Sequence, residues 1–310
     1  MAKKPKVALI ILTWNQKEMT QEQMKDVAKL DTSGLNAECL LVDNGSTDGT
    51  PEYFEDFKLP NMDFKYINTG ANLGFAGGNN IGMRDAVERG FDYMLLMNND
   101  LILKKDLLKV LLKIAEEDKK IGLLSPKMYF AKGYEYHKDR YKKTELGKVL
   151  WYAGGDIDRN NIYTTHRGVD EVDEGQYDEQ AETDVANGAC VLTRNKLVKD
   201  IGYLREKYFL YWEDAEYSER AKRAGWKVVY TPATHLWHKV SQASGIGSQL
   251  NDYFLTRNRL DFGMRYARLR TKLALVRESL RLLTKGREWQ KTGVRDFFLC
   301  RFGKGSWGKK

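Results

Sequence analysis

Residues 6–14 read KVALIILTW, an uninterrupted run of apolar side chains that follows a short basic start. A run of this kind is typical of a strand that a parallel sheet buries on both faces. The run is short and passes directly into Trp14 and Asn15 without a small-residue cleavage site, so we interpret it as a strand and not as a signal peptide. It sets the expectation of an α/β fold built around a buried sheet.

Strand and helix patterns alternate after this first strand. Further strands are expected at 37–47, 63–70 and 91–100, and helices at 16–30, 50–57, 75–90 and 103–118. This order predicts a mostly parallel sheet flanked by helices. Residues 131–183 are turn-rich without a long periodic element, order returns over 184–240, and the last 25 residues have no defined pattern.

Composition sets the broad class of the protein. The 310 residues are 42% hydrophobic, which suits a globular chain with a large core or a core domain plus an appendage. Three scattered cysteines form no CxxC pair, so neither a disulfide framework nor a cysteine zinc site is expected. No stretch approaches the roughly 18 apolar residues of a spanning helix. We therefore expect a reducing, cytoplasmic location.

The positive charge is concentrated at the C-terminal end. Residues 257–310 carry 16 Lys and Arg against 4 Asp and Glu, whereas the preceding residues carry 35 against 39. Residues 250–285 form a basic helical region with one apolar stripe, made of Leu269, Leu273, Val276, Leu280 and Leu283. The region either packs on the rest of the chain with a solvated face, or attaches peripherally to anionic lipid on the inner face of the cell membrane.

Two polar segments follow buried strands and could bind a nucleotide. Residues 42–50, VDNGSTDGT, place Asp43 at a strand tip, where it could accept hydrogen bonds from a ribose or a base, or simply cap a turn. Residues 72–82, NLGFAGGNNIG, could bring backbone amides close to a phosphate or sugar, or form a tight loop. The segment 72–82 does not match GxGxxG, and GxxxxGK[ST] does not occur in the chain, so neither a Rossmann dinucleotide site nor a P-loop is supported.

Two other segments carry possible metal ligands. The strand MLLMNND, residues 94–100, ends in Asn98, Asn99 and Asp100, whose oxygens suit Mg²⁺ or Mn²⁺, although they could instead cap the next helix. The segment HLWH, residues 235–238, offers His238 as a neutral nitrogen ligand, although a single histidine is more often structural.

The segment YFLYWED, residues 208–214, joins an aromatic run to two carboxylates. Aromatic side chains such as Trp212 bind sugar faces and lower the local dielectric, which raises the pKa of a carboxyl group and makes it a better base. Asp214 could instead be a helix N-cap.

Together and in this order, these segments resemble the family 2 glycosyltransferases with a GT-A fold, in particular the rhamnosyltransferase-like and galactofuranosyltransferase-like branch. The resemblance covers residues 7–244 and rests on ILTWN, VDNGSTDGT, NLGFAGGNNIG, MNND, WYAGG, NGACVLTR, YFLYWEDAEYSERAKRAGWKVVYTP and HLWHK.

The resemblance implies a role for each matching residue. Asp214 corresponds to the catalytic base, and Asp100 and His238 to the metal ligands; Asn98 departs from the first Asp of the family's Asp-x-Asp motif. The implied donor contacts are Thr13, Asn15, Asp43, Asn72, Gly74, Asn79 and Asn99. The implied sugar or acceptor contacts are Trp151, Gly154, Gly155, Trp212 and Glu213.

The resemblance also implies an organisation and an activity. Residues 1–245 would form the GT-A catalytic domain, with a nucleotide-sugar half at 1–130 and an acceptor half at 131–245, and residues 246–310 a basic helical extension. The expected activity is metal-dependent, inverting transfer of a sugar, with rhamnose from dTDP-rhamnose first, onto a glycan or lipid-linked glycan in cell-surface polysaccharide synthesis. UDP-hexose or UDP-galactofuranose are alternative donors.

Other classes of protein explain less of the sequence. A nucleotidyltransferase would have a glycine-rich, arginine-bearing loop after the first strand, where this chain has TWNQKEM. A module that only binds membrane surfaces or nucleic acid would explain the basic tail but not Asp100, Asp214 and His238. Nucleic acid is therefore not an expected partner.

Overall fold

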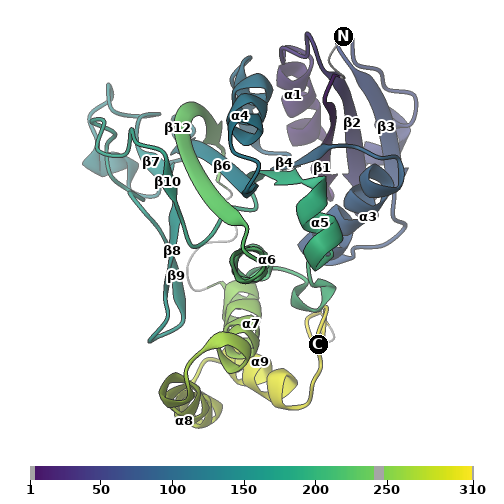
Figure 1. Ribbon diagram of the computed structural model, residues 1–310. Coiled ribbons are helices and arrows are strands. Elements are labelled where there is room, and N and C mark those ends of the chain that lie inside the picture. The colour runs from purple at the N-terminus through teal and green to yellow at the C-terminus, as the bar shows by residue number, and fades with distance from the viewer. Residues whose placement is uncertain (1–3, 241–247, 309–310) are drawn as a thin grey trace.

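The structure is a computed structural model that describes residues 4–240 and 248–308 (Figure 1). The strands of its main sheet are β1 (Lys6–Thr13), β2 (Asn36–Asp43), β3 (Asp63–Asn68), β4 (Tyr93–Asn98), β5 (Leu101–Leu103), β6 (Ile121–Phe130), β7 (Leu150–Tyr152), β10 (Ala181–Glu182), β11 (Cys190–Arg194) and β12 (Lys227–His238). The order across this sheet is β10-β12-β6-β11-β4-β1-β2-β3, with β5 paired to β12 and β7 to β6.

Strands β1 to β4 run parallel to one another, and β6 runs parallel to β12. Strand β11 lies antiparallel between β4 and β6. The predicted mostly parallel sheet is therefore confirmed. Because Thr13 pairs with Asp43, and Asp43 with Asn68, the polar ends of three strands lie at one edge of the sheet.

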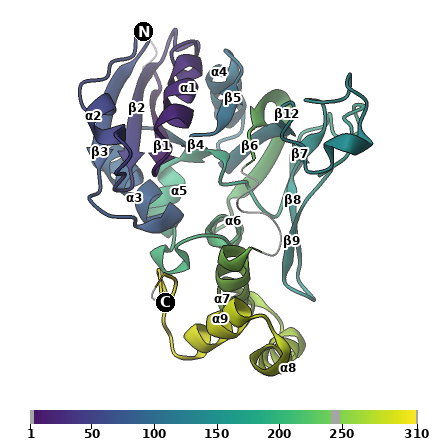
Figure 2. The same ribbon diagram turned by 180° about the vertical axis from the view of Figure 1, so that it is seen from behind.

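Helices cover both faces of the sheet, as Figure 2 shows from behind. They are α1 (Lys17–Val27), α2 (Thr50–Phe54), α3 (Gly74–Glu88), α4 (Leu107–Glu117), α5 (Asn195–Ile201) and α6 (Glu213–Arg223). Successive residues of a strand point to opposite faces. Leu9 and Ile11 of β1 share a core with α1 and α4, and Ala8 and Ile10 share a core with α3, α5 and α6.

The turn-rich residues between β6 and β11 contain only short elements, as expected. Beside β7 and β10 they form the 3₁₀ turn η1 (Lys138–Arg140) and a separate hairpin of β8 (Gly155–Asp158) and β9 (Tyr163–His166). A second 3₁₀ turn, η2 (Glu206–Tyr208), precedes α6. The hairpin extends toward the C-terminal helices in both views, and Arg259 fastens it there by donating to the Ile162 carbonyl.

The C-terminal region consists of α7 (Gln249–Tyr266), α8 (Leu269–Lys285) and α9 (Glu288–Phe298), gathered at one end of the molecule below α6 (Figure 1). Helix α9 corrects the expectation that the last 25 residues lack a defined element. The expected domain boundary at residues 245 and 246 lies outside the described residues. These helices share a core with the rest of the chain, because Leu260 and Phe262 pack with Tyr208 and Trp212.

Helix α8 leaves most of its predicted apolar stripe exposed to solvent. Its buried residues are Thr271, Leu275 and Ser279. Leu269, Leu273 and Leu280 of the expected apolar stripe are instead 73%, 64% and 58% exposed. The stripe exists, but most of it points away from the core.

Candidate active site

Backbone pairing brings Asp100 next to His238. Strand β5 pairs antiparallel with the end of β12, so that Leu101 lies opposite His238, and the Lys239 N–H donates to the Asp100 carbonyl at 2.9 Å. As a result, the Asp100 Oδ1 lies 3.0 Å from the His238 Nε2, with both side chains largely buried. Helix α4 begins at Leu107 with Asp106 as its N-cap, so Asp100 does not cap it.

This pair fits a divalent cation. The Asp100 Oδ1 is buried and makes no hydrogen bond, and the nitrogen that it faces is the His238 Nε2. Two ligands bound at right angles about 2.1 Å from one ion lie about 3 Å apart, which matches the spacing of the pair. No group of three or more candidate ligands occurs in the two described ranges, so a cation here would need further oxygens from a bound diphosphate.

Trp151 and His166 pack beside the pair. The Trp151 ring meets the His238 ring edge-on at 4.2 Å and the His166 ring at 4.8 Å. Burial lowers the pKa of His166 to about 4, so its ring is neutral at pH 7. The ring donates from Nδ1 to the Trp151 carbonyl at 3.1 Å and accepts at Nε2 from the Asn187 amide at 3.0 Å.

Asn187 continues the line of contacts to Asp214. The next residue, Gly188, donates its N–H to the Asp214 Oδ2 at 3.3 Å, and the Ala189 carbonyl accepts from the Asn98 N–H at 2.9 Å. The loop 187–189 therefore touches both the end of β4 and the start of α6. An unbroken series of contacts joins the Asp100–His238 pair to Asp214.

The adjacent carboxyl groups of Glu213, which is buried, and Asp214, which is half-buried, lie in the first turn of α6. Burial raises the pKa of Asp214, against the opposing effect of N–H groups from Ala215 and Gly188. Burial also raises the pKa of Glu213, and the adjacent Asp214 charge raises it further. The pair therefore retains a proton near neutral pH, and the two N–H groups favour the charge on Asp214.

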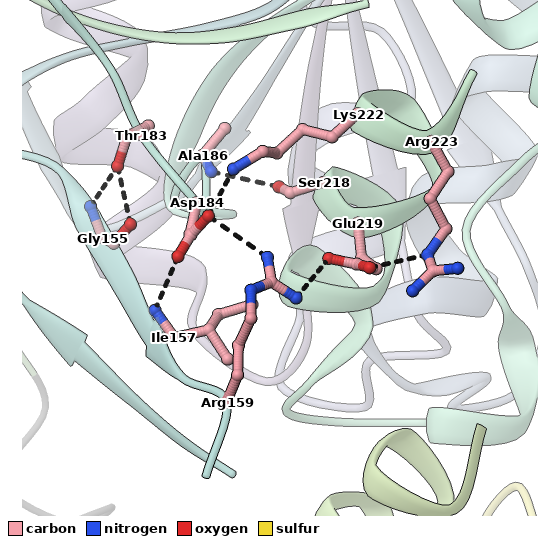
Figure 3. A network of polar contacts seen from close by, with 10 residues as sticks. All are labelled: Gly155, Ile157, Arg159, Thr183, Asp184, Ala186, Ser218, Glu219, Lys222 and Arg223. Carbon is pink, nitrogen blue, oxygen red and sulfur yellow. Dashed lines mark hydrogen bonds and ion pairs between the residues drawn. The ribbon is translucent and has the colours of Figure 1, made fainter. Parts of the chain in front are cut away.

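A polar network fixes α6 against the hairpin (Figure 3). Asp184 accepts from the Ile157 N–H at 3.2 Å and binds both Arg159 and Lys222. Arg159 also binds Glu219 of α6 at 3.0 Å. Because β8 and α6 are tied at several points, the helix that carries Asp214 has a defined position.

Several predicted donor residues are engaged inside the protein. Asn99 donates to the Thr13 hydroxyl at 3.2 Å, and both side chains are buried. The two Asp43 carboxylate oxygens accept from the Ser46 N–H at 2.8 Å and the Tyr66 hydroxyl at 2.6 Å. These side chains hold the loops at the strand ends.

Asn15 is the exposed member of the predicted donor group. Its Oδ1 accepts from the Thr47 N–H at 2.8 Å, which joins the end of β1 to the loop after β2. Its backbone has a φ of 50°, a conformation that asparagine tolerates better than most residues.

The glycine-rich loop is held by an asparagine that the sequence did not single out. Asn44 donates to the Asn72 Oδ1 at 3.2 Å and to the Gly74 carbonyl at 3.0 Å. Asn72 in turn accepts from the Gly74 N–H at 2.8 Å. Asn79 donates to the Phe75 carbonyl, while its buried Oδ1 has no partner. The hydrogen bonds of Asn44 form because two loops that are distant in the sequence lie side by side in the fold. No sequence pattern indicates them.

The predicted acceptor residues are divided between two places. Trp151 lies beside His238, but Trp212 is only 6% exposed and packs on Phe262 of α7 at 4.9 Å. The expected aromatic wall for a sugar is therefore corrected at Trp212, whose ring belongs to the core. Gly154 and Gly155 serve close packing: a Cβ on Gly154 would lie 2.8 Å from the Arg167 guanidinium.

Comparison with known proteins agrees with this arrangement. The family model described as "Glycosyl transferase family 2" matches residues 8–172, more than half of the chain. The N-acetylglucosaminyl-diphospho-decaprenol L-rhamnosyltransferase of Mycobacterium tuberculosis is 28% identical over 216 residues, which are 66% of this chain and 67% of that protein.

Solved structures share the fold at low sequence identity. A mannosyltransferase from Pyrobaculum calidifontis, in complex with GDP-Man and Mn²⁺, aligns with 99% of this chain and 77% of its own at a TM-score of 0.55 and 13% identity. GalNAc-T7 with UDP, GalNAc and Mn²⁺ aligns with 93% of this chain and 58% of its own, at a TM-score of 0.61 and 14% identity. The chain has the GT-A fold and belongs to glycosyl transferase family 2.

Proposed function

We propose that this glycosyltransferase moves a sugar from a nucleoside-diphosphate donor to an acceptor hydroxyl with inversion at the anomeric carbon. The proposal rests on one observation: continuous contacts join the buried pair Asp100–His238 to Asp214, a carboxylate with a raised pKa. Such a site has a place for the donor diphosphate at one end and a base at the other.

Asp100 and His238 would hold Mg²⁺ or Mn²⁺ through the oxygen and nitrogen that they direct at each other. A bound cation supplies neutralisation of the charge on the leaving diphosphate. The neutral His166 and the Trp151 ring fix the orientation of the His238 imidazole. The structural relatives whose complexes contain Mn²⁺ and a nucleotide support the use of a divalent cation.

Asp214 would take the proton of the acceptor hydroxyl as that hydroxyl attacks the anomeric carbon. Burial favours this role, because it brings the pKa of the carboxyl group closer to neutral pH. Direct attack on the face opposite the leaving group inverts the anomeric centre in a single displacement. The proton retained by the pair leaves Glu213 to orient the acceptor rather than to act as a second base.

For the donor we propose dTDP-rhamnose, and for the acceptor a glycan or lipid-linked glycan of a cell-surface polysaccharide. The Mycobacterium tuberculosis relative, named as an N-acetylglucosaminyl-diphospho-decaprenol L-rhamnosyltransferase and 28% identical, supports rhamnose as the sugar and a lipid-linked acceptor. UDP-hexose and UDP-galactofuranose remain the alternative donors, and residues 1–245 remain the proposed catalytic part.

A panel of nucleotide sugars tests this function. The purified chain is incubated with dTDP-rhamnose, UDP-hexoses and UDP-galactofuranose, each with Mn²⁺ or with EDTA, and the released nucleoside diphosphate is measured. We expect metal-dependent release, fastest with one donor. Equal release by the wild type and by Asp100→Ala for every donor would contradict the proposal.

We also propose that α8 contacts an anionic membrane at the inner face of the cell membrane. None of the helices in the described ranges is long and apolar enough to span a bilayer. The exposed leucines Leu273 and Leu280 alternate on α8 with exposed Arg277 and Arg281. Arginine beside protruding apolar side chains suits a surface of negative lipid headgroups.

Vesicle flotation tests the membrane contact. We expect the chain to float with vesicles that contain phosphatidylglycerol and to be released by high salt. The double variant Leu273→Ser/Leu280→Ser should lose flotation, whereas Leu255→Ser, at an exposed leucine of α7, should retain it. Wild-type flotation by the double variant would reject the α8 surface.

A further inference from the structure

The segment that leads into Asp214 has a strained backbone. Phe209 has φ 63° and ψ −57°, and the Leu210 N–H donates to the Tyr208 carbonyl at 2.7 Å, which makes a γ-turn with positive φ. This turn is rare and strained for residues other than glycine. Tyr211 and Trp212 follow with φ of 66° and 74°. Strain of this kind persists only where surrounding contacts impose the conformation.

Asn258 of α7 supplies such contacts. Its amide Nδ2 donates to the carbonyls of Tyr208 at 2.9 Å, Leu210 at 2.8 Å and Tyr211 at 2.9 Å. Asn258 is completely buried. The two N–H groups of this amide therefore reach three carbonyls of the strained turn, with one N–H shared between two carbonyls. The last of the three residues, Tyr211, lies two positions before Glu213.

Arg257 fixes the orientation of Asn258. The Arg257 Nε donates to the Asn258 Oδ1 at 3.0 Å, so the amide must turn its N–H groups toward the segment 208–211. The other guanidinium N–H groups donate to the Tyr253 hydroxyl and to the carbonyls of Lys207, Tyr208 and Arg301. All five donors of this fully buried side chain are thus used.

The opposite side of the turn touches the glycine-rich loop. The Phe75 N–H donates to the Phe209 carbonyl at 2.6 Å, and a Cβ on Gly74 would lie 2.4 Å from the same oxygen. The Phe209 ring stacks on Phe254 of α7 at 5.3 Å. The strained turn is therefore clamped between the start of α3 and α7.

We propose that Arg257 and Asn258 are positioning residues that hold the turn at 208–212 and thereby aim the Asp214 carboxylate at the acceptor hydroxyl. The inference rests on the proposed function and deepens it, because it makes the basic C-terminal region a part of the catalytic arrangement. A purely structural role would lower stability without changing turnover per folded molecule.

The test uses the full chain and a matched control. Asn258→Ala removes the donor to all three carbonyls, and Arg257→Lys keeps the charge but not the fork that orients Asn258. The control is Arg259→Lys on the same helix, because Arg259 is also largely buried but donates to Asn161, Ile162 and Glu278. Turnover is normalised to the sites that bind nucleoside diphosphate and Mn²⁺ in calorimetry.

We expect Asn258→Ala to lower kcat by about 10²-fold, as a misplacement of about 1 Å can do, with KM for the donor nearly unchanged. The acidic limb of its pH profile should also move, because the surroundings of Asp214 change. Arg257→Lys should show a smaller loss of kcat, because the Asn258 amide is then less firmly oriented. If Asn258→Ala does not fold, the kcat of Arg257→Lys is the test of the positioning role. Arg259→Lys should keep the wild-type kcat.

Asp214→Asn, measured in the same series, separates this inference from the proposed function. If Asp214→Asn loses turnover while Asn258→Ala and Arg257→Lys keep the wild-type kcat and pH profile, the positioning role is wrong and the proposed function stands. If Asp214→Asn keeps full turnover, the proposed function fails, and the positioning role fails with it.

Discussion

Asp100 and His238 meet because of backbone pairing and not because of any local sequence feature. The sequence marked both as ligand candidates, since each polar side chain follows an apolar strand. Their distance of 3.0 Å follows from the antiparallel pairing of β5 with the end of β12, and the sequence did not predict β5 as a strand. The residue types were therefore predictable and the resemblance implied a shared ion, but no local pattern indicated the pairing that brings the two side chains together.

Asp100→Ala should weaken the binding of nucleoside diphosphate with Mn²⁺ by at least about 10–100-fold, because even residues that only support a ligand cost that much. Isothermal titration calorimetry with and without Mn²⁺ measures the effect. Binding without metal should change little. An unchanged affinity in the presence of Mn²⁺ would show that Asp100 does not hold the cation.

The raised pKa of Asp214 has a consequence for the pH dependence of the reaction. The base must be ionised, so kcat/KM should fall as the pH drops through the pKa of Asp214. Because burial raises this pKa, the fall should begin above the pH expected for an ordinary aspartate of pKa about 3.9. A profile that stays flat down to pH 4, with the protein still folded, would contradict this assignment.

At the scale of elements, Gly74 is the place where the glycine-rich loop packs against the strained turn that precedes Asp214. Its φ is +76°, and a Cβ would collide with the Phe209 carbonyl. Gly74→Ala should therefore cost about 1–3 kcal/mol of stability and lower turnover by displacing the turn before Asp214. Thermal melting and kcat measure both effects.

Gly90→Ala is the matched control for Gly74→Ala. Gly90 has a similar φ of +69°, but a Cβ there would meet nothing within 4 Å. The strain of positive φ is common to both variants, so the difference between them reports the collision with Phe209. Equal stability and equal turnover in the two variants would mean that the contact is unimportant.

The sequence predicted the alternating strands and helices well, because their apolar periods are strong. It did not predict α9, and it found the apolar stripe of α8 without its direction. An amphipathic pattern says that one face of a helix is apolar. It does not say whether that face meets the core, a membrane or a partner.

At the scale of the whole molecule, the C-terminal helices complete the core around the candidate base. Leu260 and Phe262 of α7 cover Tyr208 and Trp212, and Arg257 fills the interior behind the strained turn. Long-range hydrogen bonds of this kind leave no trace in local sequence. The expected division at residues 245 and 246 lies outside the described residues and stays a prediction.

A chain that ends at residue 248 tests this view. Loss of the packing of Phe262 alone should cost about 3–5 kcal/mol, which corresponds to a melting temperature lower by roughly 10 °C or more. Differential scanning calorimetry measures the change. A truncated chain with the full melting temperature and full turnover would show instead that residues 1–245 form an independent catalytic domain.

The central claim is that Asp214 is the base of a sugar transfer, and the comparison of Asp214→Asn with the wild type tests it most directly. Steady-state turnover and calorimetric binding of nucleoside diphosphate with Mn²⁺ are measured on the same preparations. The account predicts a loss of turnover of about 10²–10⁴-fold with donor-side binding nearly unchanged. Wild-type turnover by Asp214→Asn would contradict it.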